Sequence, residues 1–179
     1  MTQDSLNYAG LRPRIQAFAL DYLIISAYLL CLLGLVRALG ISPSWVGSSG
    51  RGQLVGFLSV TLPVTLYFAI TEASHKHASW GKQKLSLRVT DLAGLGVGWP
   101  RSMARTVLKF VPWELAHTAI WRLRFATGNA TTWSIMLGLV WMLIFANLTS
   151  LLVSRKCQTL YDWLASTIVV RQKSAQVTS

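Results

Sequence analysis

Residues 15–39 read IQAFALDYLIISAYLLCLLGLVRAL, and Asp21 and Arg37 are the only charged side chains among them. A hydrocarbon core of about 30 Å is crossed by roughly 20 mostly apolar residues in a helix, so this stretch is long enough to span a membrane. It is also longer than the apolar part of a cleaved signal peptide, and it lacks a small-residue cleavage site before polar sequence. We therefore expect it to remain in the mature protein as a membrane helix.

Two further stretches extend this expectation. Residues 133–153 carry no charge, and residues 54–70 form an uncharged run at the lower limit of a span. Hydrophobic residues make up 53% of the 179 residues and charged residues only 13%, which lies outside the usual soluble range. The composition predicts an all-α membrane protein with a bundle of about four helices, in a single domain over residues 1–173 with a polar tail at 174–179.

The fourth helix is expected at residues 101–120, where Arg105, Lys109 and Glu114 interrupt an apolar pattern. This segment is either a short membrane helix or an amphipathic helix in the interface. If it crosses, the basic residues left outside are Arg37, Arg51, Arg122 and Arg124. If it does not, the basic residues after the last span also lie outside. The positive-inside rule therefore favours four crossings, with the basic loops and both termini cytoplasmic.

A small β element is expected on the same side. Residues 84–91, KLSLRVTD, alternate between apolar and polar, and residues 96–99 are expected to return as a second short strand. Residues 167–171, TIVVR, are rich in β-branched side chains. Because an isolated two-stranded hairpin is only marginally stable, pairing with the tail strand is favoured. That pairing requires both segments on one side of the membrane.

The net charge of +11 does not indicate nucleic-acid binding. No recognition motif accompanies the charge, and the basic residues flank apolar spans, where anionic lipid headgroups favour them. His75 and His77 alternate in a loop without a third ligand, which favours solvated histidines over a metal site. No serine–histidine, cysteine–histidine or paired-carboxylate arrangement is evident. The sequence therefore predicts the lipid bilayer as a partner, and neither an enzyme nor a bound cofactor, metal or nucleic acid.

Asp21 is the most informative single residue, because a carboxylate about two turns into a membrane helix is costly unless it is paired, protonated or hydrated. Arg14 lies on the same helical face but about 10 Å away along the axis, which favours a shared partner or a water between them over a direct pair. Asp21 either locks helices together or acts as a protonatable or cation-binding group. The locking role is favoured, because one carboxylate makes a poor ion cage.

Three blocks of sequence resemble a known family. They are RPRIQAFALDYLI at residues 12–24, ASWGKQKLSLRV at 78–89 and QTLYDWLASTIVV at 158–170. In this order they resemble the RDD domain family, named for one arginine and two aspartates. The resemblance implies a polar constellation of Arg14, Asp21 and Asp162, and a loop motif that contains Gly81, Lys82 and Arg88. Arg14 would then meet Asp162 and fasten the tail to the bundle.

The chain departs from the family pattern at a few positions. Ala78 and Ser79 stand where Gly and Thr are usual, and Ser86 and Ser166 stand where Gly is common. Gly adopts a positive φ without the penalty that other residues incur.

The resemblance also suggests two roles. Transport has been attributed to some proteins of this kind, which implies a small-cation or proton-coupled transporter, with Asp21 binding the monovalent cation or proton. Four helices make a narrow path, so a transporter of this size would be a homo-oligomer. The alternative is a non-transporting membrane scaffold or assembly factor that binds another membrane protein. For either role we expect the plasma membrane of a bacterium.

Overall fold

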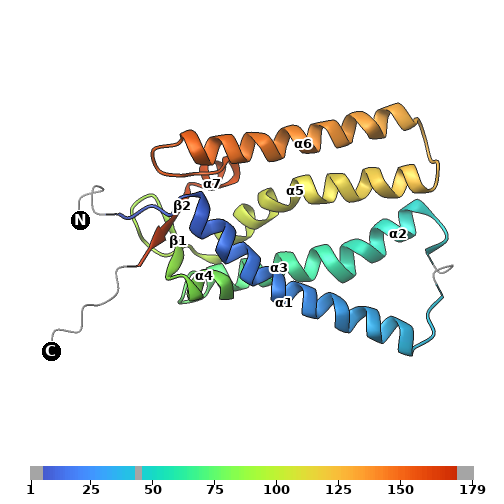
Figure 1. Cartoon of the computed structure of the whole chain (residues 1–179), viewed down its shortest axis with the longest axis horizontal. Coiled ribbons are helices and arrows are strands. Elements are labelled where there is room, and N and C mark those ends of the chain that lie inside the picture. Colours follow the sequence, from blue (N-terminus) through green and yellow to red (C-terminus); the bar gives the residue numbers. More distant parts are fainter. Residues whose placement is uncertain (1–5, 43–45, 173–179) are drawn as a thin grey trace.

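The computed structural model describes residues 6–42 and 46–172. Four long helical stretches form a bundle with a small two-stranded sheet at one end (Figure 1). The long helices are α1 (Leu11–Ala38), α2 (Ser49–Gly56) with its continuation through η3 (Phe57–Thr61) into α3 (Leu62–Ala73), α5 (Trp99–Arg124) and α6 (Ala130–Val153). The short elements are α4 (Trp80–Lys84), α7 (Leu160–Leu164), β1 (Leu87–Asp91) and β2 (Thr167–Arg171). The expected helical membrane bundle is confirmed, while the expected tail at 174–179 lies outside the described residues.

Three stretches are long and apolar enough to cross a membrane: Leu11–Ala38, Ser49–Ala73 and Ala130–Val153. Many of their large apolar side chains face outward, such as Leu30 at 68% and Phe145 at 60% exposure. Soluble monomeric proteins rarely expose apolar patches of this extent. The second stretch is longer than the run expected at 54–70, because the helix already begins at Ser49, where Ser48 caps it. Such outward-facing apolar surfaces are typical of helices in lipid.

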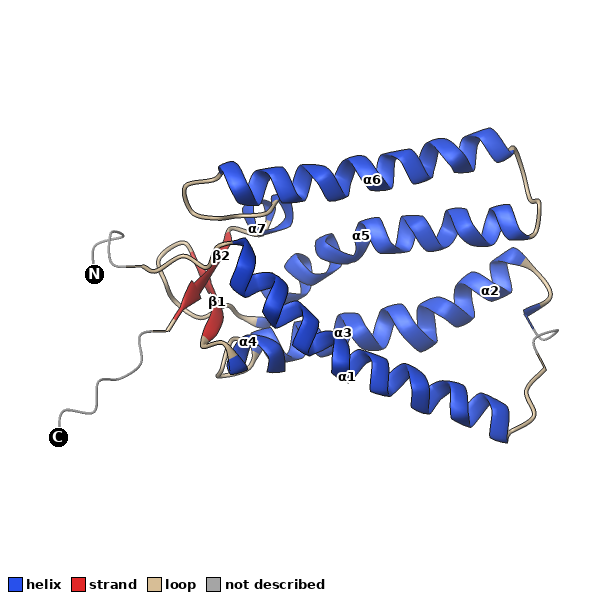
Figure 2. Cartoon of the chain, in the orientation of Figure 1, coloured by secondary structure: helices blue, strands red, loops and turns tan. Residues whose placement is uncertain are grey.

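The charged segment at residues 101–120 lies within α5, a helix of 26 residues. At about 1.5 Å per residue it is about 39 Å long. It runs side by side with α6 and also packs against α3 (Figure 2). Both described chain ends lie at the sheet end of the bundle, where Tyr8 bridges Val170. A chain that begins and ends on one side of a membrane crosses it an even number of times, so this placement fits the four crossings expected from the distribution of basic residues.

The sheet pairs β1 with β2 in antiparallel register, from Leu87 opposite Arg171 to Asp91 opposite Thr167. The pairing with the tail is as expected, but the return strand expected at 96–99 is wrong. Only Gly96 bridges back to Thr90, because Gly98 is already the N-cap of α5 and Pro100 fixes its first turn. We call β1, β2 and the turn at residues 92–98 the β cap.

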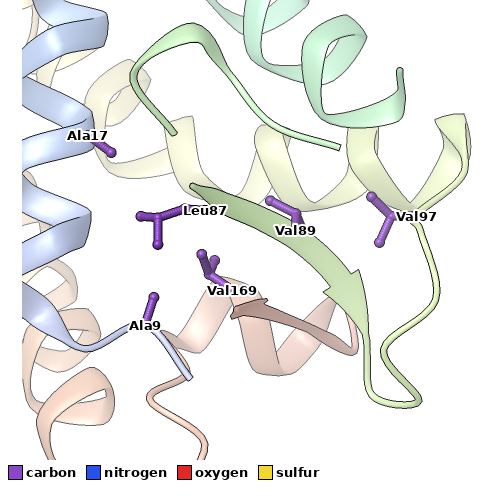
Figure 3. Packing of buried hydrophobic residues seen from close by; sticks show 6 residues of the cluster. All are labelled: Ala9, Ala17, Leu87, Val89, Val97 and Val169. Carbon is purple, nitrogen blue, oxygen red and sulfur yellow. The ribbon is translucent and has the colours of Figure 1, made fainter. Parts of the chain in front are cut away.

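The β cap has its own apolar core. Side chains from the N-terminal segment, α1, both strands and the cap turn meet there (Figure 3): Ala9, Ala17, Leu87, Val89, Val97 and Val169. Ala9 also donates its backbone N–H to the carbonyl of Val169. The N-terminal segment therefore covers the sheet and holds the start of α1 against it.

The chain repeats one local structure. The same series follows α3 and α6: a residue with positive φ, a short helix, a second residue with positive φ and a strand. Corresponding residues of the two series are always the same number of positions apart in the sequence. The φ values are 49° at His77 and 48° at Cys157, then 55° at Ser86 and 53° at Ser166. Each half thus consists of two long helices, a short helix and a strand. Ser86 and Ser166 keep the left-handed backbone for which the family commonly uses Gly.

We predict that reporter fusions at Asn129 and after the C-terminus lie on opposite sides of the membrane. The reason is that the α5–α6 turn lies at the end of the bundle opposite the sheet (Figure 1). Alkaline phosphatase and green fluorescent protein, which are active on opposite sides, measure this placement. A fusion at Gly40 is the control and must agree with Asn129. If Asn129 and the C-terminus share a side, α5 does not cross.

Candidate functional site

Arg14 and Asp162 meet at the sheet end of the bundle. Arg14 Nη1 lies 2.6 Å from Asp162 Oδ2, so the start of α1 is joined to α7. Arg14 also donates to the carbonyls of Cys157 at 2.6 Å and Ala9 at 3.0 Å. The guanidinium therefore holds the N-terminal segment, α1 and the approach to α7 together.

Two residues that the sequence did not predict as part of a site extend this pair into a network. Arg105 Nε lies 2.7 Å from Asp162 Oδ1, and its Nη1 lies 2.5 Å from Glu72 Oε2. The other oxygen of Glu72 accepts a hydrogen bond from Lys82 Nζ. The result is a continuous chain of ion pairs, Arg14–Asp162–Arg105–Glu72–Lys82, which joins α1, α7, α5, α3 and α4. We call these five residues the ion-pair network.

The ion-pair network is buried. The Glu72 and Asp162 side chains are 0% exposed, and Arg105 is 2% exposed. Removing charges from water is costly, and the cost is repaid only when each charge is well paired. Each carboxylate here has two cationic partners, one on each oxygen, which meets that condition.

Asp162 is also fixed within its own turn. Thr159, the N-cap of α7, accepts a hydrogen bond from the Asp162 backbone N–H, and Asp162 accepts one from that of Thr159. Burial acts to raise the pKa of Asp162, but the guanidinium groups of Arg105 and Arg14 outweigh it and hold this pKa below its usual value of 3.8. Asp162 is therefore ionised at neutral pH, as the two arginines require.

Asp21 lies apart from the ion-pair network. Its Oδ1 accepts hydrogen bonds from the Tyr67 hydroxyl at 2.9 Å and the Gly81 backbone N–H at 2.7 Å. Its Oδ2 accepts one from the Ser79 hydroxyl at 2.6 Å. Ser79 is the N-cap of α4, so the carboxylate lies at the N-terminus of that helix. The partner shared with Arg14 that the sequence favoured is not seen among the hydrogen bonds of the described residues; neutral donors hold Asp21 instead.

Gly81 makes this arrangement possible. A Cβ atom at this position would lie 2.0 Å from the Ala17 carbonyl oxygen and 3.0 Å from Asp21 Cγ. Only a residue without a side chain lets α4 approach α1 closely enough for the Gly81 N–H to reach the carboxylate. The glycine of the loop motif thus serves close packing.

The other two residues of the loop motif have different surroundings. Lys82 belongs to the ion-pair network, whereas Arg88 lies on β1 opposite Val170 and outside the network. Arg88 Nε is buried and has no hydrogen-bond partner among the described residues. Glu72 and Arg105 were missed, although the sequence contained a signal for Glu72. The chain has only six acidic residues, and Glu72 lies directly at the end of an apolar run.

A cavity of about 280 Å³ lies beside the network, between the two halves of the chain. Arg14, Asp21 and Lys82 line it from the first half, and Arg105 and Lys109 from the second. Lys109 Nζ lies 3.5 Å from the centroid of the Phe68 ring. No group of three or more potential metal ligands is found in the described part of the chain.

We predict that Gly81→Ala destabilises the protein by about 3 kcal/mol or more, because the new methyl group must displace α4 from α1 and break the bond to Asp21. The measurement is the apparent melting temperature in detergent. Gly138→Ala is the matched control, because nothing lies within 4 Å of a Cβ atom built on that residue. Equal melting temperatures for the two variants would contradict the close approach.

Comparison with known proteins gives one match. The profile of the RDD family matches residues 8–166, which includes Arg14, Asp21, Gly81, Lys82, Arg88 and Asp162. No curated protein and no solved structure matches the chain. The match covers most of the sequence, including both halves of the bundle and the complete ion-pair network. The chain therefore belongs to the RDD family.

Proposed function

We propose that this protein is a non-transporting membrane scaffold, in which the bundle holds the β cap and α7 as a rigid platform for another membrane protein. The observation that carries the proposal is that the buried carboxylates find their partners within the chain. Glu72 and Asp162 each have two cationic partners, and Asp21 has three neutral donors. These groups fasten elements to one another, and within residues 6–42 and 46–172 they leave no buried carboxylate available to bind a cation.

The platform has a surface suited to a partner. On α7, Asp162 faces inward while Trp163 and Leu164 are 68% and 60% exposed. These two side chains line a cavity of about 480 Å³ together with Leu92 from the β cap and Lys156. An exposed Trp beside a basic residue favours a partner segment that is apolar with an acidic flank. The proposed setting is the cytoplasmic face of a bacterial plasma membrane, where the basic loops of the chain belong.

A crosslinking experiment tests the platform. A photo-crosslinking side chain at position 163 is expected to capture a foreign membrane protein in native membranes, and Lys156→Glu is expected to reduce this capture severalfold. Position 139 on α6 is the matched control, because Leu139 is also exposed but lies within a span. Crosslinks only between copies of this chain, or equal capture at both positions, would contradict the platform.

Small-cation or proton-coupled transport is the second candidate, and one observation favours it. Asp21 lines the cavity between the two halves, and in transporters built from structural repeats the binding site lies where the repeats meet. Four cationic side chains line the same cavity, which disfavours a metal cation and leaves a proton as the better fit.

Proteoliposomes distinguish the two roles. The scaffold proposal predicts that the intact protein gives no cation-dependent pH change above that of empty vesicles, and that Asp21→Asn lowers only the melting temperature, by removing the charged acceptor of three hydrogen bonds. Gly138→Ala is the control for reconstitution. A pH change with the intact protein that disappears in Asp21→Asn would replace the scaffold with the transporter.

A further inference from the structure

The cavity between the two halves has an excess of positive charge. Arg14, Lys82 and Arg105 line it, and the carboxylates of the ion-pair network neutralise them only in part. Lys109 adds a fourth cationic side chain, and it has no hydrogen bond or ion pair within residues 6–42 and 46–172. Together, the cavity and the adjoining ion-pair network contain four bases and, counting Asp21, three acids. The cavity is therefore one negative charge short of neutrality.

Lys109 is placed to receive an anion. Aromatic rings surround its ammonium group, with the Phe68 centroid at 3.5 Å and those of Phe110 and Phe18 at 5.4 and 5.8 Å. Rings hold a cation through their faces but do not neutralise it. An anion at Lys109 would give this ammonium group the charged partner that it lacks among the described residues.

Among the described residues, Asp21 is the one carboxylate that lines the cavity and would face an incoming anion. Both of its oxygens already accept hydrogen bonds, Oδ1 from Tyr67 and Gly81 and Oδ2 from Ser79. These hydrogen bonds offset part of the repulsion between the carboxylate and an anion. The four cationic side chains outweigh what remains.

Most of the remaining lining of the cavity is apolar, although Thr159 and Tyr161 also contribute to it. Ile15 and Phe18 line it from α1, and Leu151 lines it from the last turn of α6. Ile15 and Phe18 are 56% and 48% exposed, so the cavity continues into the outward-facing surface of a membrane helix. It lies where α1 begins and α6 ends, which is the level of the lipid headgroups for spans of this length. A basic floor with apolar walls at that depth fits an amphipathic anion.

We propose that this cavity is a binding site for the phosphate group of an anionic phospholipid. Lys109 and the outer edge of Arg14 would bind the phosphate, and the acyl chains would lie along Ile15 and Phe18. Basic pockets between membrane helices are known to bind such headgroups. The bound lipid would contact both halves of the chain, and its phosphate would supply the negative charge that the ion-pair network does not provide for Lys109.

Native mass spectrometry of the delipidated protein in detergent tests the site, with added phosphatidylglycerol or phosphatidylcholine. The intact protein is expected to retain phosphatidylglycerol in preference to phosphatidylcholine, and Lys109→Met is expected to weaken this binding roughly fivefold. Lys84→Met is the matched control, because Lys84 is an exposed lysine that contacts the Trp80 ring. It should bind as the intact protein does.

Lys109→Arg guards against a folding defect, since it keeps the charge and should restore binding. Equal binding of the two lipids, or unchanged binding by a folded Lys109→Met variant, would overturn the site. Inorganic phosphate is added in a separate arm to distinguish the source of the phosphate. Displacement of phosphatidylglycerol by millimolar phosphate would overturn the lipid assignment, whereas resistance to it supports the contribution of the acyl chains.

Discussion

The rest of the structure depends on the chain of buried ion pairs from Arg14 to Lys82. It joins five elements that come from the beginning, middle and end of the sequence. Removing one partner from a buried pair leaves an uncompensated charge, which costs more than the pair itself contributes. The five elements must therefore stay together or separate together. The bundle is small, and many of its other contacts are apolar ones that lipid could replace, so this constraint defines the arrangement at the sheet end.

The repeated local structure gives the network its form. Lys82 and Asp162 occupy corresponding positions in α4 and α7, and they carry opposite charges. Arg105 and Glu72 link them as an alternating series of base and acid. The strands that follow these short helices pair with one another, so the two halves are joined twice, by the sheet and by the network. A cavity with surplus positive charge remains beside this junction.

Much of the fold could be predicted from the sequence because lipid imposes a simple rule on composition. The apolar stretches that form α1 and α6 are evident by length alone, and the β-branched tail predicts β2. The return strand at 96–99 could not be excluded from the sequence, because the same residues fit both a short strand and the start of a helix. In the structure Gly98 caps α5 and Pro100 lies in its first turn, which decides for the helix. The extent of the second span was underestimated, since the glycines and polar residues after Ser49 lower its apolar content.

The site was only partly predictable. The resemblance to the family implied that Arg14 meets Asp162, and these residues are in contact. Glu72 and Arg105 could not be connected by spacing, because they lie on different helices and meet only through tertiary packing. The donors to Asp21 were equally hidden, because two hydroxyls and a backbone N–H give no charge signal in a sequence. Burial of a carboxylate was therefore foreseeable, but the nature of its partners was not.

The most direct test of the central claim is a double-mutant cycle between Arg105 and Asp162, with free energies of unfolding measured by SDS titration in mixed micelles. The replacements are Arg105→Met and Asp162→Asn. The half-exposed pair Arg101–Asp91, at 3.6 Å, serves as the reference and should show a coupling below about 1 kcal/mol. We predict a coupling of about 2 kcal/mol or more for Arg105 and Asp162. A coupling no larger than that of the reference pair would show that this buried ion pair does not hold the sheet end together.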